Sequence, residues 1–104
     1  MDRASLLDEI RSHLQRTFGR RLRGVVIHGS EARGDAKNDN DVDVLVLLDG
    51  PVHLDDDLDR ILHSLHPLQL EVDRIIEAFP VTYEDYETGR LPIYRNAKRE
   101  GVLL

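Results

Sequence analysis

The chain has 104 residues, of which 33% are charged and 40% hydrophobic, and this balance indicates a folded domain rather than a disordered segment. The net charge of −6 argues against non-specific binding to a nucleic-acid duplex, zero cysteines exclude disulfides and thiolate sites, and no apolar run is long enough to span a membrane. With no signal-peptide core after Met1, we expect a single cytoplasmic domain over residues 1–104.

An amphipathic helix is the first expected element. Ser5 is its expected N-cap, with Asp8 three residues later in a capping-box arrangement. Apolar residues then recur at helical spacing up to Gly19, where the helix should end. They are Leu6, Leu7, Ile10, Leu14 and Phe18.

Two apolar runs, residues 25–28 and 42–48, follow as expected strands joined by a polar connection. Asp41 and Asp43 stand at the head of the second run. A strand places such residues on one face, about 6.5 to 7 Å apart along the chain. Two carboxylates this close repel unless a cation lies between them, and hard oxygen ligands of this kind suit Mg²⁺.

Gly29 and Ser30 end the first of these strands and open an expected helical turn that reaches Arg33. Glycine allows the backbone to approach a ligand closely, and free N–H groups with a hydroxyl can hold phosphate oxygens. Alone, a Gly-Ser pair is typical of an ordinary turn and an Asp-x-Asp pair of a solvated strand end. Their combination on consecutive strands is much less common than either pair alone.

The second half of the chain begins with a helix expected from about Asp55 to His66. Three successive aspartates form its acidic first turn, which favours a helix start over a metal site. Pro67 is expected to break this helix.

A third strand is expected over residues 68–79, ended by Pro80. Alternation places Glu71 and Asp73 on the same face of that strand, so the pattern by itself leaves both as candidates for a third carboxylate.

Two further helices complete the chain: a short one capped by Thr82 that runs through Tyr86, and a last one from Ile93 to Glu100, with Pro92 suited to its first turn and Gly101 stopping it. The predicted fold class is therefore α/β, with a small mixed sheet and helices packed mainly on one side.

The residues Gly29, Ser30, Asp41 and Asp43, within GSEARGDAKNDNDVDVLVLL, resemble the signature of the polymerase-β-like nucleotidyltransferase superfamily. The Ala32-Arg33-Gly34 flank resembles its minimal nucleotidyltransferase branch. One departure is Asn40, where a serine is often found before the first aspartate.

This resemblance implies the polymerase-β-like fold and metal-dependent transfer of AMP from ATP to a hydroxyl acceptor. Asp41, Asp43 and a third acid would hold two Mg²⁺ ions, and Asp73 matches the apolar-Asp context of that third acid better than Glu71. Gly29 and Ser30 would hold the β and γ phosphates of ATP. Arg33 would neutralise phosphate charge, although an exposed helical arginine is an equal alternative.

Many members of this branch are antitoxins paired with a HEPN-domain toxin. The resemblance therefore implies a tyrosine of a cognate HEPN toxin as the acceptor, in a type VII toxin–antitoxin system. The main alternative is a non-catalytic antitoxin that neutralises its partner by occlusion. A third alternative, an acidic structural domain that binds Ca²⁺, would need more oxygen ligands. The sequence leaves open whether copies of this chain form a homo-oligomer.

Overall fold

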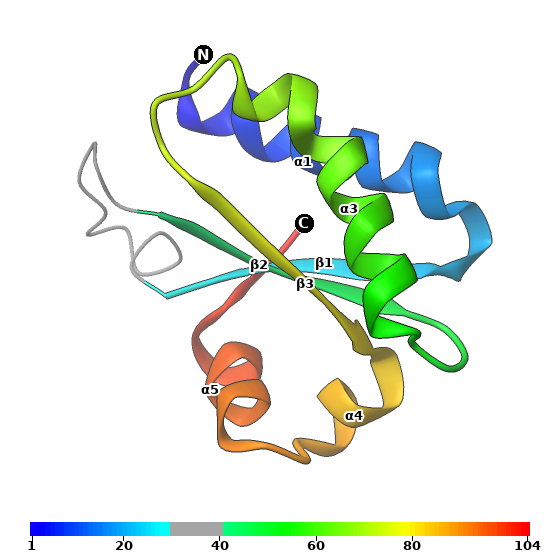
Figure 1. The fold of residues 1–104 in the computed structure, drawn as a ribbon. Coiled ribbons are helices and arrows are strands. Elements are labelled where there is room, and N and C mark those ends of the chain that lie inside the picture. Colours follow the sequence, from blue (N-terminus) through cyan, green and yellow to red (C-terminus); the bar gives the residue numbers. More distant parts are fainter. Residues whose placement is uncertain (30–40) are drawn as a thin grey trace.

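The computed structural model describes residues 1–29 and 41–104, and its elements form a mixed α/β fold (Figure 1). Its helices are α1 (Arg3–Phe18), α3 (Leu54–Gln69), α4 (Tyr83–Thr88) and α5 (Pro92–Glu100), with a 3-10 turn η1 (Gly19–Arg21). Its strands are β1 (Leu22–His28), β2 (Val42–Leu48), β3 (Ile76–Thr82) and β4 (Val102–Leu103). They form one sheet in the order β3-β2-β1-β4. Strand β2 runs antiparallel to β1 and parallel to β3, so the sheet is mixed as expected.

The two long helices, α1 and α3, cover one face of the sheet (Figure 1). Strand alternation turns Val44 and Val46 of β2, with Val25 and Ile27 of β1, toward these helices. The apolar stripe predicted for the first helix faces them and is buried. This face forms the larger part of the hydrophobic core.

The opposite face is covered only in part, by the short helices α4 and α5 below the sheet (Figure 1). Tyr86 of α4 and Ala97 of α5 are buried there against Leu45, Leu47 and strand neighbours on β1 and β3. Because these helices have 6 and 9 residues, they leave one end of this face uncovered.

The helix starts were predicted with mixed success. Asp2, and not Ser5, caps α1, because its carboxylate accepts a hydrogen bond of 2.8 Å from the Ser5 backbone N–H. The helix therefore begins at Arg3. The Thr82 cap is confirmed, since its hydroxyl accepts from the Asp85 N–H at 3.2 Å.

Two prolines were wrongly expected to end their elements. Pro67 lies inside the last turn of α3, which continues to Gln69 and closes with a Leu70 N–H bond to the His66 carbonyl. Pro80 lies inside β3. A proline is tolerated there because β3 is an edge strand, where one side of the backbone needs no partner strand.

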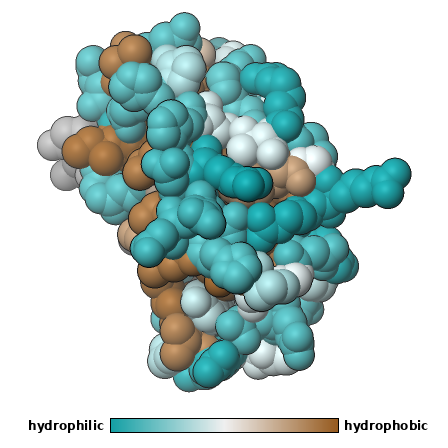
Figure 2. Space-filling view, turned by 45° about the vertical axis from the view of Figure 1, so that its right-hand side comes forward, coloured by the Kyte–Doolittle hydropathy of each residue, from teal (hydrophilic) through white to brown (hydrophobic). Residues whose placement is uncertain are grey.

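Strand β4 was not predicted at all. It has two residues and pairs antiparallel with β1, with Leu103 opposite Val26. Such a short strand carries no readable alternation, so only the paired backbone reveals it. In the described ranges, no helix has the length and apolar character needed to cross a membrane. The face in Figure 2 is mostly hydrophilic, with apolar patches between polar side chains.

The acidic start of α3 carries one buried carboxylate, Asp57, which is 2% exposed. The two terminal guanidinium nitrogens of Arg21, Nη1 and Nη2, donate to it at 2.8 and 3.0 Å, and the backbone N–H of His53 donates at 3.0 Å. The Arg21 hydrogen bonds hold the pKa of the Asp57 carboxyl below its usual value of 3.8. Asp57 therefore ties the start of α3 to the turn before β1.

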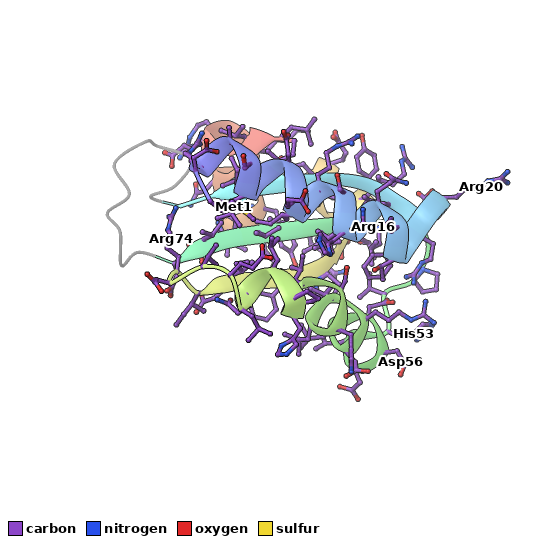
Figure 3. The ribbon with its side chains drawn as sticks, turned by 90° about the horizontal axis from the view of Figure 1, so that it is seen from above. Met1, Arg16, Arg20, His53, Asp56 and Arg74 are labelled. Carbon is purple, nitrogen blue, oxygen red and sulfur yellow. The ribbon has the colours of Figure 1, made fainter. Side chains whose placement is uncertain are left out.

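Replacing Asp57 with alanine should lower the free energy of unfolding by about 2 to 4 kcal/mol, because three donors lose a charged acceptor. Asp56→Ala is the matched control, since Asp56 is exposed on the same turn (Figure 3), and it should cost less than about 1 kcal/mol. Urea unfolding measures both. The depressed pKa means that this stabilisation is present above pH 3.8 and lost as the pH falls through the lowered pKa, so the two proteins should converge in acid. Equal losses in both variants would contradict this role.

Candidate active site

The uncovered end of the second sheet face carries three carboxylates. Asp43 on β2 lies opposite His28 on β1 and opposite Glu77 on β3 in the strand register. Asp41 immediately precedes β2, and strand alternation places it on the same face as Asp43. Strands β2 and β3 thus bring Asp41, Asp43 and Glu77 together where these two strands begin.

The charges of these side chains interact. The negative charge of Asp41, followed by burial and by hydrogen bonding with Asp43, raises the pKa of Glu77 above its usual value of 4.5. Like charges disfavour ionisation of a carboxyl group, and a cation between them would reverse that effect. Burial lowers the pKa of His28, while the charge of Asp43 opposes this shift.

Gly29 brings the backbone close to the same carboxylates. It directly follows β1 and has a φ of 73°, which disfavours other residues. A Cβ at this position would lie 2.7 Å from the Asp43 Oδ2 atom, closer than such atoms approach. The positive φ therefore favours glycine here, and a larger residue would also have to displace the Asp43 carboxylate.

Residues 7–104 match the sequence profile of the nucleotidyltransferase domain. This chain belongs to the nucleotidyltransferase domain family. Its fold is also similar to a crystal structure of a candidate nucleotidyltransferase from Sulfolobus solfataricus, with a TM-score of 0.66 and 21% sequence identity over 95% of this chain and 76% of that one. A comparison with curated proteins finds no significant match. Family and fold together place the chain in the polymerase-β-like superfamily, as the resemblance implied.

The predicted site residues of this nucleotidyltransferase domain are brought together only in part. Asp41, Asp43 and Gly29 meet at one edge of the sheet, as expected. Ser30 and Arg33 lie outside the described residues, so their predicted phosphate contacts stay predictions.

Asp73 was placed on the third strand, and that placement is wrong. Strand β3 begins at Ile76, and Asp73 lies with Glu71 in the turn after α3. The two acids line a hollow of about 310 Å³ with Met1 and other residues at the start of α1. Figure 3 shows Arg74, the next residue, at the same end of the molecule as Met1.

Glu77 was missed by the sequence reading. It occupies the β3 position opposite Asp43 where Asp73 was expected. In β3, buried Ala78 and Pro80 alternate with exposed Glu77 and Phe79. This alternation could have indicated Glu77, but only if Pro80 is accepted inside an edge strand.

The donor set fits a divalent cation of the magnesium type, because all three side chains supply hard carboxylate oxygens. Within residues 1–29 and 41–104, no group of three or more Asp, Glu, His or Cys side chains is placed so that it could hold a metal ion. Magnesium is usually bound by one or two carboxylates, with substrate phosphates and water as its other ligands.

A hollow of about 650 Å³ lies at the other end of the sheet, beside the last residues of β2 and β3. Its arginines are already paired: Arg23 with Asp49 at 2.7 Å and Arg90 with Asp85 at 3.5 Å. An anionic substrate would have to compete with these acids, so volume alone does not make this hollow the active site.

Proposed function

We propose that this chain transfers AMP from ATP to a hydroxyl acceptor. The acceptor oxygen forms a bond to the α phosphorus, the bond from that phosphorus to the bridging oxygen breaks, and pyrophosphate leaves. The hydroxyl proton passes to a carboxylate or to water. Glu77 lies opposite Asp43 on the neighbouring strand, and Gly29, directly after β1, brings the backbone against the Asp43 carboxylate; this arrangement is the observation that best supports the reaction.

In this proposal Asp41, Asp43 and Glu77 would hold the Mg²⁺ ions that accompany ATP, two in number by analogy with other phosphoryl-transfer sites. Bound magnesium would neutralise charge on the phosphates. Gly29, with Ser30 beyond it, holds the β and γ phosphates through backbone N–H groups. Glu77 lies at the other side of Asp43, where its carboxylate orients the acceptor hydroxyl and can take its proton.

The proposed acceptor is a tyrosine of a cognate HEPN-domain toxin, which would make this chain a type VII antitoxin of the minimal nucleotidyltransferase branch. The sequence resemblance around Ala32-Arg33-Gly34 supports this partner. The net charge of −6 also argues for a protein acceptor over a nucleic acid. A folded partner can position its own hydroxyl, which supplies the orientation that a small domain lacks.

Mixing this protein with MgATP and a HEPN-type protein encoded beside it should add mass to the partner in AMP-sized steps. Intact-protein mass spectrometry measures the gain, and Asp41→Asn should prevent it, because that variant loses a carboxylate of the metal site. Asp49→Asn, at the far end of β2, should leave the gain unchanged. An unmodified partner that is fully inhibited in a stable complex would instead establish neutralisation by occlusion.

A further inference from the structure

Phe79 is an exposed aromatic residue beside the carboxylates. It follows Glu77 by two positions on β3 and therefore lies on the same face of the sheet. Its register neighbour on β2, Leu45, is buried, whereas Phe79 is 54% exposed. Helices α4 and α5 cover Leu47 and Val81 one row further on and stop short of Phe79.

Ile75 lies on the other side of Glu77. It directly precedes β3, and its carbonyl accepts a hydrogen bond of 2.8 Å from the Val42 N–H, which extends the β2–β3 ladder by one residue. Alternation then places Ile75 on the Glu77 face, beside Asp41. It is 56% exposed. Glu77 is thus flanked along its strand by two large apolar side chains that the fold leaves uncovered.

If the proposed function holds, the order of the strands decides whether the nucleotide or the acceptor contacts Ile75 and Phe79. Gly29 directly follows β1, Asp43 lies on β2 and Glu77 lies on β3, so the phosphate-holding glycine and Glu77 are on opposite sides of Asp43. Phosphoryl transfer requires the attacking and leaving oxygens to lie roughly in line. Pyrophosphate held at Gly29 therefore leaves over β1, and the acceptor approaches over β3.

We propose that Phe79 and Ile75 form the surface on which the acceptor rests, and that this surface selects a hydroxyl carried on an apolar, planar group such as a phenol. A polyol or a ribose would gain nothing from two exposed apolar side chains, whereas an aromatic ring can stack on Phe79 and bury part of it. Phe79 is in this sense a positioning residue. Glu77, between the two, remains the group that contacts the hydroxyl.

Transfer of labelled AMP from MgATP to N-acetyl-tyrosinamide tests this surface with a phenol that carries no other recognition element. Phe79→Ala should raise KM for this probe about tenfold with little change in kcat, because uniform binding is lost. Phe79→Leu should recover most of the loss, since it restores apolar area. Ile75→Ala should raise KM by a smaller factor, about threefold.

Leu103→Ala is the matched control, because Leu103 is 69% exposed on β4, the opposite edge strand. It should leave KM and kcat unchanged. The Kd for MgATP, measured by calorimetry without acceptor, should be the same in the wild type, Phe79→Ala and Leu103→Ala.

Each other outcome is decisive. Equal KM values for Phe79→Ala and Leu103→Ala would overturn the surface, and so would a wild type that binds MgATP but labels no phenol. A weakened MgATP affinity in Phe79→Ala would assign Phe79 to nucleotide binding instead. A wild type that does not bind MgATP would overturn the proposed function, and this inference with it.

Discussion

Replacing both Asp41 and Asp43 with asparagine is expected to abolish nucleotidyl transfer while the protein stays folded. The two carboxylates lie at the start of β2, partly buried, and they are not part of the hydrophobic core. Asparagine keeps their size but removes the charge that a divalent cation requires. Without metal, the melting temperature should stay the same or rise, because repulsion with Glu77 is relieved.

The double variant needs a control that also removes an aspartate charge from β2 or its end. Asp49→Asn serves, since Asp49 follows β2 at its far end and is half-exposed in an ion pair with Arg23. It should cost at most about 1 kcal/mol and leave transfer intact. Full activity in the double variant would show that these aspartates are not the metal ligands.

Glu77→Gln is expected to reduce kcat by at least about 100-fold, the loss typical when a general base is removed. Asp73→Asn should change kcat less than about threefold, because Asp73 lies in the turn before β3 and not opposite Asp43. Single-turnover kinetics with saturating MgATP separates the chemical step from binding. The opposite ranking would restore Asp73 as the third acid.

Glu77→Gln also has a signature that needs no substrate. The pKa of Glu77 is raised in the folded protein, so its ionisation opposes folding. Without metal, the wild type should lose this part of its stability as the pH rises from below 4.5 through the raised pKa, and the Gln variant should not. Thermal melts between pH 4 and 7 compare the two, and parallel curves would contradict the shift.

Features that depend on residues close together in the sequence were predictable from the sequence alone. Strand β2 was predicted with its observed bounds, because its six apolar residues form an almost continuous run that only Asp43 interrupts. Gly29 and the Asp41–Asp43 pair were also predictable, since their roles depend on adjacent strands and on local backbone conformation. The pattern at Pro92 and Gly101 likewise predicted α5.

Glu77, Phe79 and Ile75 acquired their positions only from the tertiary structure. Pro80 reads as the end of a strand in an isolated sequence, and it is acceptable only because β3 lies at the edge of the sheet. Shifting that strand from residues 68–79 to Ile76–Thr82 exchanges Asp73 for Glu77 opposite Asp43. Which acid faces a neighbouring strand depends on long-range pairing, and one sequence carries no direct record of that pairing.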